Sequence, residues 1–152
     1  MTERLAPTCT NLQDEQAFPS FSQCPHEDES PYDYYRDRED GVFPPTRHWC
    51  YLGEITERVH ITHLRLTVKD RKGDDVITAF YLDQASQLES PTSPVHPNVP
   101  MSLTNKGNTI AILYAQRHDF LDRTVGFRIE DADQVQVRRI LWEGNLLKDR
   151  PT

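Results

Sequence analysis

The stretch ITHLRLTVKDRKGDDVITAFYL, residues 61–82, decides the fold of this 152-residue chain. In its first part the even-numbered positions from 62 to 68 are mostly apolar, whereas the odd-numbered positions between them are polar. This period of two predicts a half-buried strand. The sequence DRKGD at 70–74 supplies a turn in which Gly73 suits a positive φ. Residues 76–82 are rich in β-branched and aromatic side chains, so they predict a central strand paired with the first.

Three further strand-like stretches surround this hairpin. Residues 48–55 precede it, residues 109–115 follow it, and a final ribbon runs from 126–129 to 135–137. Five strands in this order can close a small barrel with a filled interior. We therefore predict an all-β fold, a five-stranded Greek-key barrel.

A long connection joins the third and fourth strands of the predicted barrel. Residues 84–106 contain four prolines, which cannot sustain a helix, and a loop of this length in a compact domain is typically functional or disordered. The inward parity of three different strands predicts that Leu66, Phe80 and Ile112 lie in the core.

The charge of the chain is concentrated in its first 45 residues. They hold ten acids, three arginines and six prolines, whereas residues 46–152 hold 14 acidic and 14 basic groups. Residues 1–45 are therefore predicted to be an acidic, Pro-rich leader that is either flexible or wrapped on the barrel, and we expect the barrel to stay folded without residues 1–30. Residues 46–140 form the barrel, and residues 141–152 are a C-terminal extension and a candidate short helix. A neutral barrel argues against a dominant contact with a phosphate backbone.

The sequence predicts neither a metal site nor a cofactor. The three cysteines form no C-x-x-C pair, and this pattern is typical of a reducing compartment. The spacing C-x-H…H-x-C, made by Cys24, His26, His48 and Cys50, lacks the gaps of a structural zinc site. Because no signal peptide or membrane span is visible either, we expect a cytoplasmic or nuclear protein without membrane partners.

Several segments resemble a known family of barrels. The pattern GEI…LRLTVKDRKGDDVITAFYLD…KGNTIAILYA resembles OB-fold domains of the replication-protein-A type. The stretch GNTIAILYAQRHDFLDRTVGFRIEDADQVQV is also similar to uncharacterised fungal proteins in which a comparable barrel often precedes a MYND-type zinc finger. No Cys/His array follows up to Thr152, so we expect any zinc-finger activity to be absent or to belong to a separate protein.

The OB-fold resemblance implies a ligand-binding face on the second and third strands, flanked by the loops after the first and fourth strands. The ligand-binding residues expected on that face are Arg65, Lys69, Tyr81, Arg117, His118 and Phe120. Aromatic rings with arginines suit the bases and phosphates of single-stranded nucleic acid. The alternative is that the aromatic residues of this region fill the barrel core and that Arg65 is a solvated surface residue.

The neutral barrel and the acidic leader favour a protein partner. We therefore predict a non-enzymatic binding module that acts as a protein-interaction adaptor, with single-stranded DNA or RNA binding as the alternative. A small enzyme with a site in the barrel mouth is a third interpretation, but the sequence places no Ser or Cys nucleophile beside His118, so no catalytic residue is predicted.

Overall fold

The computed structural model describes residues 11–29, 31, 33–36, 41, 44–82, 99–143 and 146–149, with the backbone alone for 140–149. Among them no helix is long and apolar enough to cross a membrane. The strands are β1 (Cys50–His60), β2 (Leu64–Asp70), β3 (Asp75–Phe80), β4 (Thr109–Leu113), β5 (Arg117–Asp119), β6 (Val125–Ile129), β7 (Val135–Arg138), β8 (Ile140–Glu143) and β9 (Leu146–Asp149). Three single-turn 3-10 helices accompany them: η1 (Phe21–Gln23), η3 (Met101–Leu103) and η4 (Ala132–Gln134).

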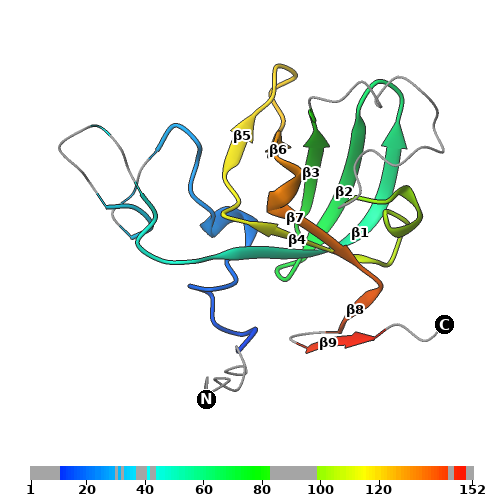
Figure 1. The fold of residues 1–152 in the computed structure, drawn as a ribbon, viewed down its shortest axis with the longest axis horizontal. Coiled ribbons are helices and arrows are strands. Elements are labelled where there is room, and N and C mark those ends of the chain that lie inside the picture. Colours follow the sequence, from blue (N-terminus) through cyan, green and yellow to red (C-terminus); the bar gives the residue numbers. More distant parts are fainter. Residues whose placement is uncertain are drawn as a thin grey trace, which may run out of the picture.

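The sheet has the strand order β5-β6-β3-β2-β1-β4-β7 (Figure 1). Strands β1, β2 and β3 form an antiparallel meander, and β4 pairs antiparallel with β1. The one parallel pairing of the described sheet joins β3 to β6, and β6 in turn pairs antiparallel with β5. Because β4 continues into β5 after only three residues, one bent strand pairs with β1 through β4 and with β6 through β5, and it thereby closes the barrel.

The bend between β4 and β5 falls at Tyr114, which has a φ of 52°. A positive φ is uncommon for an aromatic residue and is held here by its neighbours. The Tyr114 backbone amide donates to the Trp49 carbonyl oxygen at 3.0 Å, and the Trp49 indole Nε1 donates to the Ala115 carbonyl oxygen at 3.0 Å. These two bonds tie the bend to the chain just before β1.

The predicted all-β class and the five-stranded Greek-key barrel are confirmed. The barrel strands are β1, β2, β3, the bent β4–β5 strand and β6. The last expected ribbon is arranged differently, because β7 pairs with β4 and not with β6. Most of the long connection between β3 and β4, residues 83–98, lies outside the described residues.

The barrel is filled by inward-facing apolar side chains. Leu66, Phe80 and Ile112 are 0%, 1% and 0% exposed, so the predicted inward parity of their strands is correct. Tyr51 and Phe127 meet edge to face in the same core, with ring centroids 4.6 Å apart. Gly53 lies where β1 passes close to β2: a Cβ there would come within 2.3 Å of Val68 Cγ1.

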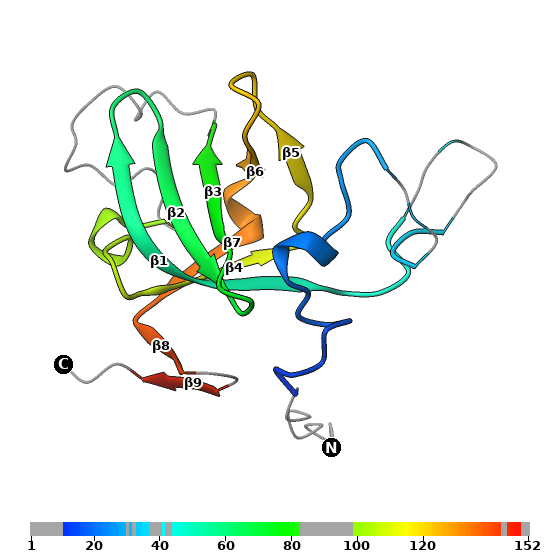
Figure 2. The ribbon, with the colours of Figure 1, turned by 180° about the vertical axis from the view of Figure 1, so that it is seen from behind.

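The middle of the leader, residues 17–27, packs on the barrel (Figure 2). Cys24 is 1% exposed within the core cluster, and the ring of Phe21 meets that of Phe127 edge to face at 5.2 Å. The backbone amide of Phe21 donates to Asp70 Oδ2 at 2.9 Å, and Arg71 Nη1 donates to the Phe18 carbonyl oxygen at 2.8 Å. Of the two forms predicted for the leader, residues 17–27 adopt the wrapped one.

The C-terminal extension contains a hairpin in place of the expected short helix. Strands β8 and β9 pair antiparallel with each other and form a separate two-stranded sheet. The sequence Gly-Asn lies between them, and such a pair between two apolar stretches favours a two-residue hairpin connection. Residues 144–145 and 150–152 lie outside the described part of the chain.

Candidate ligand-binding groove

A hollow of about 510 Å³ lies on the barrel face made by β2, β3, β5 and β6. We call it the groove. It reaches from the end of β3 to the loop that joins β5 to β6. The residues that line it are Arg65, Tyr81, His118, Asp119, Phe120, Leu121, Asp122 and Arg128.

Four of the six residues predicted for a binding face line the groove: Arg65, Tyr81, His118 and Phe120. Lys69 does not, although it shares the outward parity of Arg65. It is exposed at the far end of β2, four positions beyond Arg65, which corresponds to about 13 Å along the strand. Arg117 is also absent, because its Nε atom donates to the carbonyl oxygen of Cys24 at 2.8 Å on the leader side of β5.

Arginines lie over both aromatic rings of the groove. The Arg128 guanidinium is 4.4 Å from the centre of the Tyr81 ring, and that of Arg65 is 5.7 Å from the centre of the Phe120 ring. Each guanidinium is therefore in range for a cation–π interaction. In addition, His63 stacks on Tyr81 with ring centres 4.5 Å apart.

The Phe120 ring is seated on a glycine. A Cβ at Gly126 would lie 3.0 Å from Phe120 Cε2 and 2.1 Å from the Ile77 carbonyl oxygen. The missing side chain lets β6 approach β3 closely and leaves room for the ring on the outer face. Arg128 was not among the predicted residues, although it alternates with the buried Phe127 and Ile129 and could have been found by the same period-two pattern.

Acidic side chains balance the arginines of the groove. Arg128 forms an ion pair with Glu130 at 2.9 Å. Hydrogen bonds from the Thr124 side chain and backbone hold the pKa of Asp122 below its usual value, and the nearby Arg65 acts in the same direction. Asp119 adds another carboxylate to the lining. The groove is therefore close to neutral and carries no cationic track.

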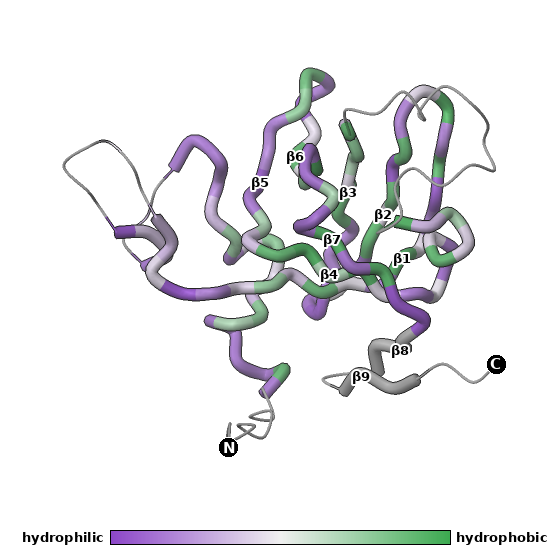
Figure 3. The backbone as a smooth tube through the Cα atoms, in the orientation of Figure 1, coloured by the Kyte–Doolittle hydropathy of each residue, from purple (hydrophilic) through white to green (hydrophobic). Residues whose placement is uncertain are grey.

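Exposed apolar side chains occur in two loops at the end of the barrel, one of which lines the groove. Leu121, in the β5–β6 loop, is fully exposed, and Ile61, in the β1–β2 loop, is 87% exposed. Both loops project from the same end of the barrel in Figures 1 and 2. Figure 3 shows hydrophobic positions in both loops, next to the mostly hydrophilic β5.

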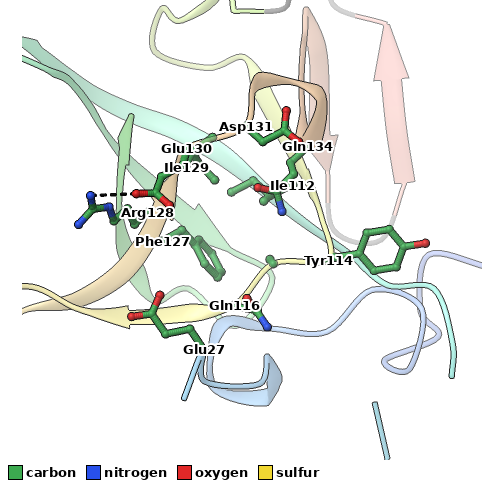
Figure 4. Close-up of a pocket in the computed structure, with 11 residues that line it drawn as sticks. Glu27, Ile112, Tyr114, Gln116, Phe127, Arg128, Ile129, Glu130, Asp131 and Gln134 are labelled. Carbon is green, nitrogen blue, oxygen red and sulfur yellow. Dashed lines mark ion pairs between the residues drawn. The ribbon is translucent and has the colours of Figure 1, made fainter. Parts of the chain in front are cut away.

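A second hollow, of about 240 Å³, lies between the leader, β4, β6 and η4 (Figure 4). We call it the acidic cleft, because Glu27, Glu130 and Asp131 line it above a floor that includes Phe127 and Ile112. The Asp131 side chain already has a local hydrogen-bond donor, because it accepts from the Asp133 amide at 2.9 Å. In the described part of the chain, no group of three His, Cys, Asp or Glu side chains could hold a metal ion.

Of the two cysteines in the described residues, Cys24 is buried and Cys50 is half-buried. Burial raises the pKa of the Cys24 thiol to about 12, a shift that the nearby Arg117 reduces only in part. Burial also raises the pKa of the Cys50 thiol to about 11. Because the thiolate is the reactive form, these raised pKa values disfavour reaction of both cysteines at neutral pH.

This burial makes Cys24 a reporter of leader release. In the variant Cys9→Ser/Cys50→Ser, we expect the remaining thiol to react with DTNB at pH 8 at least about 100-fold more slowly than the same thiol in urea, because only opened molecules expose it. The absorbance of released thionitrobenzoate measures both rates. Equal rates in the two conditions would contradict the packing of Cys24 in the core.

Known proteins are similar to this chain in structure but not in sequence. No family model matches the sequence, and no curated protein matches it. A replication protein A heterotrimer bound to single-stranded DNA is similar at a TM-score of 0.37 with 9% identity, over 71% of this chain and 76% of that chain. The S. pombe Stn1–Ten1 complex is similar at a TM-score of 0.36 with 15% identity, over 76% of this chain and 78% of that chain. The chain's own strand pairing, with β3 parallel to β6 and with β4 continuing into β5, is that of an OB-fold barrel.

Proposed function

We propose that this protein is a non-enzymatic binding module that engages a segment of a partner protein in the groove. The observation that carries the proposal is the charge balance of the groove. Arg128 is already paired with Glu130, and Asp119 and Asp122 share the lining with Arg65. A phosphate backbone needs uncompensated cations, whereas a protein segment of mixed character does not.

The side chains around the groove have the composition of a protein interface. Aromatic residues and arginine are enriched where proteins bind each other, and a central apolar anchor commonly dominates the affinity. Tyr81, Phe120 and Arg65 supply the first group. Leu121 and Ile61 present apolar surface on two loops, where a partner side chain would cover it.

The surroundings of His118 favour binding over catalysis. Its Nδ1 atom contacts a carboxylate oxygen of Glu27, and its ring meets Phe120 edge to face at 4.9 Å. Within the described residues the hydrogen-bond partner of this imidazole is a Glu27 carboxylate and not a Ser or Cys side chain, so the pair has no hydrogen-bonded nucleophile to activate. We place the binding function in the cytoplasm or nucleus, where free thiols such as Cys24 and Cys50 stay reduced.

Single-stranded nucleic acid is the second candidate ligand. One observation favours it: two aromatic rings, each with an arginine above it, line the same groove. Bases stack on such rings, and each stack contributes about 1–3 kcal/mol. The acidic groups of the groove oppose this ligand, because they repel phosphates.

Fluorescence anisotropy with a mixed-sequence 20-mer DNA decides between the two candidates. We expect no submicromolar binding at low salt, and any weak binding should be the same for Arg65→Ala, Tyr81→Ala and the matched control Lys69→Ala, whose side chain lies outside the groove. Submicromolar binding that falls steeply with salt and is lost in the first two variants alone would overturn the protein-binding proposal.

A further inference from the structure

The leader pairs with the outer edge of β5 through an isolated β-bridge. Residues His26 and Arg117 form a parallel β-bridge. The Glu27 amide donates to the Arg117 carbonyl oxygen at 3.0 Å, and the Arg117 amide donates to the Pro25 carbonyl oxygen at 2.8 Å. Strand β5 has only three residues and lies at the end of the sheet order. Its outer edge is therefore satisfied by the leader rather than by another strand of the barrel.

Two pairs of side chains cross between the leader and β5. His26 Nε2 lies 3.2 Å from Asp119 Oδ2, and His118 Nδ1 contacts Glu27 Oε1. Each pair joins one imidazole to one carboxylate. The leader supplies the imidazole of the first pair, and β5 supplies the imidazole of the second. Both β5 members, His118 and Asp119, line the groove.

The hydrogen bonds of the two Nδ1 atoms favour opposite tautomers when these imidazoles are neutral. His26 Nδ1 accepts from the Asp28 amide at 3.2 Å, so a neutral ring carries its proton on Nε2, which lies 3.2 Å from Asp119 Oδ2 without the geometry of a hydrogen bond. A carboxylate only accepts, so the proton of His118 is on Nδ1, directed at Glu27. The two imidazoles are thereby held in defined orientations.

The same leader segment is anchored in the barrel core. Cys24 is buried, Phe21 packs on Phe127, and Arg117 Nε donates to the Cys24 carbonyl oxygen at 2.8 Å. Figure 4 shows Glu27 reaching from the leader into the acidic cleft, on the side facing Arg128 and Glu130. The segment therefore contacts the core, the edge of β5 and the wall of the groove at once.

We propose that residues 24–27 act as a strap that positions the β5 wall of the groove, with His26 and Glu27 as positioning residues. Because the strap holds His118 and Asp119, the groove has the described shape only while the leader is docked. Only one consequence of this inference rests on the proposed function. A ligand that contacts the wall would stabilise the docked leader, and the docked leader would raise the affinity for the ligand by the same factor.

The strap is tested on the full-length chain without any ligand, by comparing Glu27→Ala with Glu29→Ala. Glu29 is an exposed leader acid two residues farther on. Three quantities are measured: the imidazole ¹⁵N shifts of His118, the backbone NMR signals of Phe120 and Leu121, and the DTNB rate of Cys24 in the Cys9→Ser/Cys50→Ser background. The ¹⁵N shifts report the tautomer, which a merely structural contribution to stability would not change.

In Glu27→Ala we expect His118 to lose its Nδ1–H tautomer, the Phe120 and Leu121 signals to move, and the Cys24 rate to rise about 10-fold, while Glu29→Ala resembles the wild type. Faster reaction of Cys24 with unchanged Phe120 and Leu121 signals would overturn the inference, because the leader would then be a tether that does not position the wall. No change in Glu27→Ala would overturn it as well. A groove that binds no ligand at all would leave these expectations intact, so the two proposals fail separately.

Discussion

Replacing Phe80 with alanine is expected to lower the free energy of unfolding by about 3–5 kcal/mol. Phe80 is 1% exposed and lies on β3, which pairs with β2 on one side and with β6 on the other. Removing the ring forfeits its transfer free energy and leaves a cavity among strands that cannot collapse without breaking the barrel.

Urea unfolding followed by tryptophan fluorescence measures this loss, and Phe120→Ala is the matched control. Phe120 carries the same side chain but is only partly buried, on the outer face of the barrel. We expect the control to cost less than about half as much, since its ring is already partly solvated. A loss below about 1 kcal/mol for Phe80→Ala would contradict its place in the core.

Removing residues 1–30 is expected to cost more than about 3 kcal/mol, in contrast to the expectation from composition. The deletion uncovers Phe127, empties the position of Cys24 and takes away the Phe21 amide that donates to Asp70. Asp70 is 4% exposed, so the loss of a donor leaves a buried carboxylate less satisfied.

Thermal unfolding of two truncations separates the packed part of the leader from the rest. Removal of residues 1–16 keeps Phe21 and Cys24, and we expect it to change stability little, because the described residues before position 17 are mostly exposed. Equal melting temperatures for the wild type and both truncations would show that the leader contributes nothing to the barrel.

The fold could be predicted because the strands of a half-buried sheet carry a simple pattern. The alternation over 62–69 and the β-branched run over 76–82 identified β2 and β3 and their inward faces. The residues at which strands begin and end were harder to predict. Strand β1 continues to His60, past the register shift between Ile55 and Glu57, and pairs with the whole of β2. Such a bulge depends on the partner strand and leaves no local signal.

Which part of the leader packs on the barrel could not be predicted, for a related reason. Its average composition is acidic and rich in proline, yet a few residues carry its contacts: Phe21 and Cys24 enter the main core, and Tyr34 and Tyr35 pack on Trp49. Average composition weighs every residue equally, whereas burial depends on a few anchors. The contribution of the leader to the β5 edge is a long-range pairing that no local pattern reveals.

For the groove, the fold resemblance pointed to the face of β2 and β3 on which the hollow lies, and Arg65 and Tyr81 of that face line it. Lys69 lies outside the hollow because parity gives the side of a strand but not the position along it. Arg117 lies outside it because its neighbour across the edge is the leader. Leu121 and Asp122 belong to a loop whose path a sequence pattern does not define.

Mapping a peptide ligand by NMR tests the central claim, that the groove binds a protein segment, most directly. Peptides are selected from a displayed library with the full-length protein and then titrated into ¹⁵N-labelled protein. We expect the largest shift changes at Arg65, Tyr81, Phe120 and Leu121, and an affinity at least 10-fold weaker for Arg65→Ala but unchanged for Lys69→Ala. Shift changes centred on the acidic cleft or on β7, with equal affinity in both variants, would contradict the account.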